Sequence, residues 1–491
     1  MKKILYAASE CFPFVKTGGL ADVVAALPKE FDKSQWDVRV VIPDYTCIPP
    51  QFRDNFQFVT SFQMGGGPDM GMKYVGVMEY EYQGVHYYFI DNLEYFECFY
   101  PYGDTRYDIE KFTFFDKAVL SMLPVIDFKP DLIHCHDWQT GFIPVYLKNE
   151  FQANPFYHGI KSIMTIHNLK FQGVWDIETM EGISGFPAEL FTPDKLEFNK
   201  AGNMLKGGIV YADYITTVSP TYCEEIQTPY YGEGLDGLLS SRHFDMQGIV
   251  NGIDTVTYDP STDMSIFKQY DVSNFRRNKK INKEKLQEEL GLTVDGKKYM
   301  IGLVSRLTDQ KGLDLINYCM DGIADENTQF VVCGTGENRY ENMFRHYAWK
   351  YPDRISANIC YSEDLARKLY AGCDAFLMPS HFEPCGLTQL ISFRYGTVPI
   401  VRETGGLKDT VEPYNEYEKT GDGFSFKNYN GDELLNIVNY SKYIFFTKKA
   451  DWNKMAERDM KKDYSWNASK FKYEGLYNYL CGWLDESDQE G

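Results

Sequence analysis

Positively charged side chains accompany two glycine-containing turns, one in each half of the sequence. In the first half, Lys16 precedes Gly18 and Gly19 at the start of an expected helix. In the second half, Arg306 and Lys311 lie five residues apart, immediately before another expected helix. Glycine lets backbone N–H groups approach an anion closely, and a helix N-terminus adds positive potential. Both turns therefore suit a phosphate group, with an ordinary strand-to-helix turn as the alternative reading of each.

Two further loops carry side chains suited to sugar chemistry. Glu383 lies on a loop bounded by proline and glycine, where a carboxylate can accept hydrogen bonds from hydroxyl groups or stabilise developing positive charge. Helix capping is the alternative for this residue. His167 directly follows an expected strand and is either a site residue or a structural histidine. The pair Gly405 and Gly406 follows another expected strand.

The remaining motifs argue against other kinds of site. His134 and His136 alternate with Cys135 on an expected strand, so both rings point to one face, and no second cluster completes a metal site. Neither glycine turn matches G-x-G-x-x-G or G-x-x-x-x-G-K-[ST]. The sequence therefore favours neither a metal centre, nor a nicotinamide site, nor a P-loop.

Short apolar runs alternate with helical patterns from end to end, and these elements must position the site residues. The expected strands cover residues 4–8, 38–42, 86–90, 132–135, 162–166, 214–218, 299–305, 329–333, 354–360, 375–379 and 398–401. The helical patterns between them include residues 21–31, 111–123, 138–147, 312–320, 363–371 and 386–395. This alternation predicts an α/β protein with two Rossmann-like, doubly wound domains. Ligands of open parallel sheets bind at the carboxyl ends of strands, so we expect the two domains to face a central cleft.

The domain boundary is expected near residue 250. An Asn-Gly-Ile-Asp run at residues 251–254 separates the two series of elements and supplies hinge candidates. A polar, charge-rich stretch at residues 271–298 reads as an insertion. The predicted domains are therefore residues 1–250 and 251–463, followed by 464–491, which ends in an acidic tail.

Composition places the chain among folded proteins. Its 491 residues are 44% hydrophobic and 24% charged, which excludes a disordered or fibrous chain. The net charge of −20 opposes general nucleic-acid binding. Eleven cysteines without a C-x-x-C pair suggest reduced thiols. No signal-peptide core or 18-residue apolar run occurs, so we expect a cytoplasmic protein that does not bind membranes.

Ten sequence stretches together resemble the bacterial and plant-type glycogen/starch synthase family of retaining glycosyltransferases. They are residues 16–24, 136–138, 165–173, 217–222, 234–239, 250–254, 305–312, 383–390, 404–407 and 463–466. They follow the order of that family over nearly the whole chain. The resemblance implies a GT-B fold, with a helix at residues 464–480 returning to the first domain. It also implies transfer of glucose from ADP-glucose to the non-reducing 4-hydroxyl of an α-1,4-glucan, such as glycogen or maltodextrin, without a metal or cofactor.

The resemblance assigns roles to individual residues. Arg306 and Lys311 would neutralise the diphosphate, and Glu383 would accept hydrogen bonds from sugar hydroxyls. The His167 ring or backbone carbonyl would stabilise an oxocarbenium-like state. Further residues implied in the cleft are Lys16, Gly18, Gly19, Gly405 and Gly406 at the phosphates, Asp137 and Asn251 beside the glucose, Tyr361 on the base, Ser380 and Cys385 lining the donor pocket, and Asp22 nearby. No carboxylate in this set suits a covalent nucleophile, which favours a front-face mechanism.

Two alternatives to this function stay open. A related two-domain transferase would use UDP-glucose or another acceptor, but that broader group often carries a second glutamate eight positions after the first, where this chain has Ile391. A catalytically silent glucan-binding subunit would also be rich in aromatic residues. Residues 92–110 diverge from the usual family loop, which bears on acceptor binding.

Overall fold

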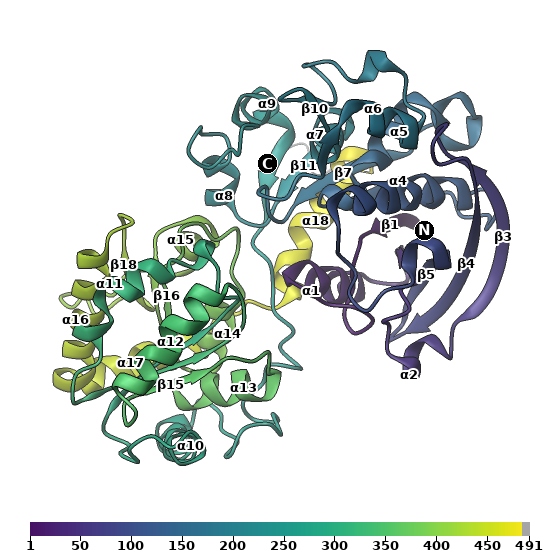
Figure 1. Ribbon diagram of the computed structural model, residues 1–491. Coiled ribbons are helices and arrows are strands. Elements are labelled where there is room, and N and C mark those ends of the chain that lie inside the picture. The colour runs from purple at the N-terminus through teal and green to yellow at the C-terminus, as the bar shows by residue number, and fades with distance from the viewer. Residues whose placement is uncertain (484–491) are drawn as a thin grey trace, which may run out of the picture. The chain divides into compact units, whose positions relative to one another are not determined.

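The structure, a computed structural model, describes residues 1–483 and consists of two compact units (Figure 1). The first unit comprises Met1–Val218, Cys223–Ile249 and the segment from Trp466. The second comprises Ser219–Tyr222 and Val250–Ser465. The predicted acidic tail at residues 485–491 lies outside the described residues. We describe each unit by itself.

A nine-stranded sheet forms the centre of the first unit. Its order is β12-β11-β7-β6-β1-β2-β5-β4-β3, and the seven strands from β12 to β5 are parallel. The strands are β1 Lys2–Ala7, β2 Trp36–Pro43, β3 Gln57–Gly65, β4 Met72–Tyr82, β5 Val85–Asp91, β6 Leu132–His136, β7 Lys161–Ile166, β11 Tyr214–Thr217 and β12 Met246–Gly248. The strand order reverses between β1 and β6, which makes this edge a topological switch point.

Helices cover the parallel strands on both faces, which explains why these strands appear as continuous apolar runs. Every residue of β6 is buried. The helices of the unit are α1 Gly19–Ala26, α2 Pro50–Arg53, α3 Leu93–Phe96, α4 Thr105–Met122, α5 Phe142–Asn149, α6 Ile177–Ser184, α7 Met204–Tyr211, α9 Asp236–Ser241 and α18 Trp466–Cys481, with α8 Pro220–Glu225 at its border. A small antiparallel sheet contains β8 Val174–Asp176, β9 Glu197–Phe198 and β10 Ala201–Asn203.

The C-terminal helix α18 is part of the first unit, as its yellow ribbon beside α1 and β1 shows (Figure 1). The hydroxyls of Tyr477 on α18 and Tyr6 on β1 are hydrogen-bonded at 2.6 Å. Tyr477 also stacks on Phe31. Because Tyr477 is fully buried, α18 completes the core of this unit.

The second unit has one six-stranded, entirely parallel sheet in the order β15-β14-β13-β16-β17-β18. Its strands are β13 Tyr299–Val304, β14 Thr328–Cys333, β15 Ile355–Asn358, β16 Ala375–Met378, β17 Val398–Arg402 and β18 Phe424–Phe426. Numbered along the chain, this is the 3-2-1-4-5-6 order of the Rossmann fold, with its switch point between β13 and β16. Both units are thus doubly wound α/β folds, as the sequence predicts.

The helices of the second unit include several that the sequence analysis did not name. The helices of this unit are α10 Phe275–Glu289, α11 Leu313–Ile323, α12 Asn338–Lys350, α13 Glu363–Gly372, α14 Thr388–Arg394, α15 Gly405–Thr410, α16 Gly431–Thr447 and α17 Lys449–Asp459. The expected polar insertion at residues 271–298 is wrong, because this stretch contains α10, which packs on α13. Within residues 1–483, no helix combines the length and apolar character needed to cross a membrane.

Candidate active site

The switch point of the second unit brings two site loops together. The loop after β13 carries Ser305, Arg306 and Lys311, and the loop after β16 carries Ser380 and Glu383. Because β13 and β16 are parallel neighbours, both loops leave the same edge of the sheet. This is the edge at which ligands of doubly wound sheets bind.

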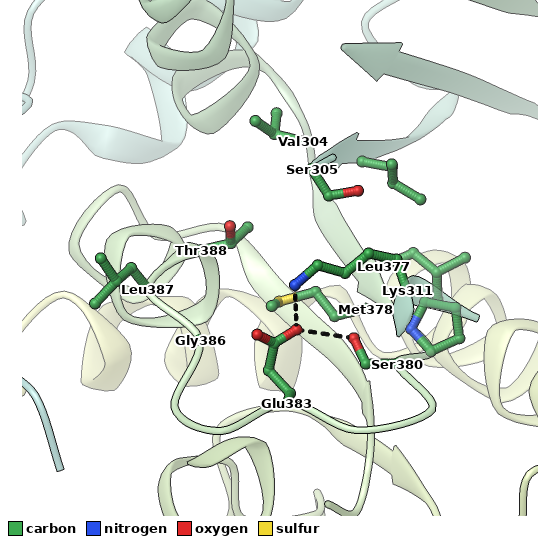
Figure 2. A pocket seen from close by; sticks show the side chains of 12 residues that line it. Val304, Ser305, Lys311, Leu377, Met378, Ser380, Glu383, Gly386, Leu387 and Thr388 are labelled. Carbon is green, nitrogen blue, oxygen red and sulfur yellow. Dashed lines mark hydrogen bonds and ion pairs between the residues drawn. The ribbon is translucent and has the colours of Figure 1, made fainter. Parts of the chain in front are cut away.

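A cavity of about 70 Å³ lies between these loops, lined by Lys311, Ser380 and Glu383 among others (Figure 2). Lys311 Nζ donates to Glu383 Oε2 at 2.6 Å, and the Ser380 hydroxyl donates to the same oxygen at 3.0 Å. The cavity exceeds the ~10–15 Å³ that one water requires. A paired cation and carboxylate therefore border a small polar space.

Two glycines permit the close approach of the loops. Gly312 has φ +67°, and a Cβ there would lie 2.0 Å from the Pro379 carbonyl oxygen. Gly405 has φ +45°, and its Cβ would lie 1.9 Å from the Glu383 carbonyl oxygen. The Gly406 N–H donates to the Glu383 and Pro384 carbonyls. Gly312 and Gly405 therefore allow neighbouring backbone segments to approach more closely than a residue with a side chain would allow.

Asn251 Oδ1 and Ser305 Oγ are among the buried polar atoms of this unit that have no hydrogen-bond partner within residues 1–483. The backbone N–H of Asn251 donates to the sulfur of Cys385, which ties the start of the unit to the Glu383 loop. Burial raises the pKa of the Cys385 thiol to about 12, so this side chain is neutral. Unpartnered buried polar atoms favour a polar ligand that would satisfy them.

Several predicted donor-site residues lie outside the cavity lining, and two of them, Arg306 and Tyr361, have exposed side chains. Arg306 is exposed, and its guanidinium forms no hydrogen bond or ion pair to any described residue. Tyr361, on the loop after β15, is 77% exposed. Both side chains are accessible from solvent.

The switch point of the first unit carries the other predicted residues. Lys16 Nζ donates to Asp22 Oδ1 at 2.8 Å, and Gly18 forms the N-cap of α1 without a side-chain cap. Glu10, which follows β1, accepts a hydrogen bond from the Thr17 N–H at 2.6 Å. Burial raises the pKa of Glu10 to about 7. A lysine, an uncapped helix start and two carboxyls therefore lie at the carboxyl edge of β1.

Asp137 and His167 meet at the ends of the neighbouring strands β6 and β7. The His167 N–H donates to Asp137 Oδ1 at 2.7 Å. Asp137 adopts φ +59° and ψ −176°, a backbone region that residues other than glycine rarely occupy. Burial raises the pKa of Asp137 to about 7 and lowers that of His167 to about 3. Strain and perturbed pKa values in one loop are typical of functional sites.

Sequence reasoning missed three residues of these sites. Ser305 directly follows β13 and Glu10 lies three residues after β1, so their positions were usable signals. Arg402 is 7% exposed and donates to the carbonyls of Ser380 and His381. These hydrogen bonds stabilise the loop that carries Glu383. No sequence pattern reveals such a contact, because it joins Arg402 to backbone carbonyls 21 and 22 positions earlier in the chain.

Two protein-family models match this chain. The starch synthase catalytic domain family matches residues 3–241, and glycosyl transferases group 1 matches residues 283–441. A glycogen synthase of Lachnospira eligens is 62% identical and aligns over 98% of this chain and 100% of its own length. One from Lachnoclostridium phytofermentans is 58% identical over the same shares. The chain belongs to the glycogen and starch synthase family.

Solved structures place this family member among the GT-B glycosyltransferases. The catalytic domain of starch synthase IV from Arabidopsis thaliana, bound to ADP and acarbose, superposes with a TM-score of 0.88 at 29% identity, covering 98% of this chain and 99% of that one. Sucrose-phosphate synthase from Thermosynechococcus elongatus matches the fold, with a TM-score of 0.63 at 15% identity. The predicted glycogen/starch synthase resemblance and fold class are confirmed, and the chain is a glycosyltransferase.

Proposed function

We propose that the protein transfers glucose from ADP-glucose to the non-reducing 4-hydroxyl of an α-1,4-glucan with retention of configuration. The observation that carries this proposal is the pairing of Lys311 with Glu383 beside a polar cavity at the switch point of the second unit. In this proposal Lys311 neutralises the diphosphate as it leaves, the step at which negative charge develops most. The relatives named glycogen synthase support the glucan as acceptor, and the ADP-bound starch synthase supports the adenine nucleotide.

The other residues take roles within the same proposal. Arg306 and Lys16 add positive charge, Glu383 accepts hydrogen bonds from sugar hydroxyls, and His167 stabilises the oxocarbenium-like state. Cys385 is neutral, and we assign it to the pocket wall without a nucleophilic role. The departing phosphate would then help to deprotonate the acceptor hydroxyl on the same face of the sugar.

The acceptor side of the proposal includes the loop between α3 and α4. Phe99 is fully exposed and Tyr100 is 59% exposed on this loop, and aromatic rings stack on sugar faces. Phe99→Ala is expected to weaken transfer to glycogen without changing the KM for the donor. Phe244→Ala, which removes another exposed ring of this unit, serves as the matched control.

Radiolabelled glucose transfer tests the function directly. ADP-glucose and UDP-glucose are offered in parallel with glycogen, with and without EDTA, to the native protein and to Lys311→Ala. We expect label from ADP-glucose, insensitivity to EDTA, and loss of transfer in the variant. Release of the label by an amylase that cleaves only α-1,4 bonds checks the linkage. Preference for UDP-glucose would support the related transferase, and no transfer from either donor would contradict the proposal.

A cytoplasmic location is part of the proposal, and cell fractionation tests it.

A further inference from the structure

A second histidine, His136, lies within hydrogen-bond distance of His167. His136 is the last residue of β6 and is fully buried, whereas His167 follows the neighbouring strand β7 and is partly exposed. The Nδ1 atom of His136 lies 2.9 Å from Nε2 of His167. This is a hydrogen-bond separation, so one ring donates an N–H and the other accepts the hydrogen bond.

The environment of His136 decides which ring donates. Its second nitrogen, Nε2, is buried and has no hydrogen-bond partner among residues 1–483. If His167 donated, the proton of His136 would have to be on that Nε2, as a buried N–H without an acceptor. If His136 donates from Nδ1, only a lone pair is left unpaired, and an orphaned N–H is the rarer and costlier of the two. His136 therefore donates, and His167 must carry its own proton on Nδ1.

Packing prevents His136 from turning away. Its ring stacks on Tyr6 at 5.4 Å and on His134 at 4.3 Å, with interplanar angles of 20° and 25°. His134 is itself held by Tyr477 Oη at 2.8 Å from Nδ1 and by Thr165 Oγ1 at 2.5 Å from Nε2. Burial lowers the pKa of His134 to about 3 and that of His136 well below its ordinary value, so neither ring takes a second proton near neutral pH.

We propose that His136 is a positioning residue that fixes His167 as the Nδ1–H tautomer, so that His167 presents a hydrogen-bond donor to an oxygen atom of the sugar donor. The Nδ1 atom of His167 has no partner within the described chain, which leaves this donor available. The part concerning the sugar rests on the proposed function, whereas the tautomer does not. A shared metal ion is a poorer account, because the described residues contain no cluster of three metal-binding side chains.

The tautomer can be measured without any substrate. Protein labelled with ¹⁵N only in histidine gives long-range ¹H–¹⁵N spectra in which protonated and unprotonated ring nitrogens have distinct shifts. His167→Ala identifies the signals of His167. We expect Nδ1 of His167 to be protonated in the native protein. In His136→Phe, which keeps a ring between Tyr6 and His134 but has no donor, this preference is expected to be lost. In His136→Asn, whose amide N–H can reach the Nδ1 position, it is expected to persist.

Kinetics then separate positioning from stability. We expect His136→Phe to lower kcat about 10- to 100-fold and His136→Asn to restore most of it. In a His167→Ala background, His136→Phe should cause no further loss, because its effect acts through the missing ring. His158→Phe, which replaces an exposed histidine of the same unit, is the control for both measurements.

Three results would overturn the inference. These are a native His167 protonated on Nε2, a native-like tautomer in His136→Phe, and an equal loss of kcat from His136→Phe with and without His167. If His136→Phe does not fold, the native spectrum and His136→Asn still decide. Absence of glucose transfer by the native protein would refute the proposed function and leave the tautomer result intact.

Discussion

The Nζ atom of Lys311 and the Oε2 atom of Glu383 lie 2.6 Å apart, and the side chains of the two residues are 18% and 8% exposed. The positive charge that the sequence analysis assigns to a diphosphate is therefore already paired with a carboxylate of the same unit. A buried pair of this kind loses much of its stabilisation if one partner is removed alone. We infer that Lys311 binds the ligand while it stays paired with Glu383. Replacement of either residue is therefore expected to impair the function of the other.

Replacement of Glu383 by glutamine tests this coupling. Glu383→Gln keeps an oxygen for the Ser380 hydroxyl but leaves Lys311 without a counter-charge. We expect a loss of glucose transfer of roughly 10²-fold or more and a fall of about 1–3 kcal/mol in the free energy of unfolding. Initial rates and urea unfolding measure the two effects. Glu337→Gln, which breaks an exposed ion pair with Arg339, should change neither by much.

Gly312 is expected to tolerate no side chain. Gly312→Ala would place a Cβ 2.0 Å from the Pro379 carbonyl oxygen, in addition to the cost of alanine at φ +67°. We expect a loss of about 3 kcal/mol or more in the free energy of unfolding, because backbone atoms cannot move aside cheaply. Gly291→Ala isolates the conformational cost, since Gly291 has φ +69° and open space around it. That control should lose only about 1 kcal/mol. Equal losses in the two variants would show that the close approach is unimportant.

Asp137 gives the protein a pH-dependent stability that asparagine should remove. The folded-state pKa of about 7 exceeds the ordinary 3.8, so between these values the folded protein holds a proton that the unfolded chain has released. Stability contributed by this group therefore falls as pH rises from about 4 to 7. The free energy of unfolding of Asp137→Asn minus that of the native protein is expected to be about 2–4 kcal/mol larger at pH 8 than at pH 4. Glucose transfer by the variant is expected to decline. A difference between the two proteins that is the same at both pH values would contradict the prediction.

Cys47 and Cys98 are the thiols expected to oxidise together. The Cys98 thiol donates to the sulfur of Cys47 at 3.9 Å, which lowers the pKa of Cys47 to about 7. With hydrogen peroxide, the Cys47 thiolate would take one oxygen to form a sulfenic acid, and the Cys98 thiol would then displace water to form a disulfide. Peptide mass spectrometry after mild peroxide should show this cross-link before any other. Cys47→Ser should abolish it, and a first cross-link elsewhere would refute the prediction.

Much of the fold was predictable because both faces of each parallel strand are covered. The expected strands at residues 132–135 and 375–379 differ from β6 and β16 by one residue. Helix α10 was missed for a physical reason: its buried face includes Asn278, Asn282 and Gln287, which bond to backbone and side-chain groups. An amphipathic pattern built on buried amides does not appear as hydrophobic periodicity. Strand β3 was not predicted, because Met64 is its only buried residue and it therefore has no continuous apolar run.

The site was predictable to the extent that its residues follow strands. Lys311, Glu383, Asp137 and His167 all lie at carboxyl ends, where strand order alone locates ligands. Their individual roles came from the family resemblance and stay predictions. The contact between His136 and His167 was out of reach, because His136 reads as a strand residue and its partner is 31 positions away.

Helix α18 has a consequence for the order in which the chain can fold during synthesis. The first unit needs Tyr477 and its neighbours to fill its core, yet these residues emerge from the ribosome only after the whole second unit. The N-terminal strands must therefore wait, incompletely packed, while roughly half of the protein is translated. Residues 250–465 can form their own sheet in the meantime. Domains usually fold from the N-terminal one onward, and here the later-made unit is the first able to finish.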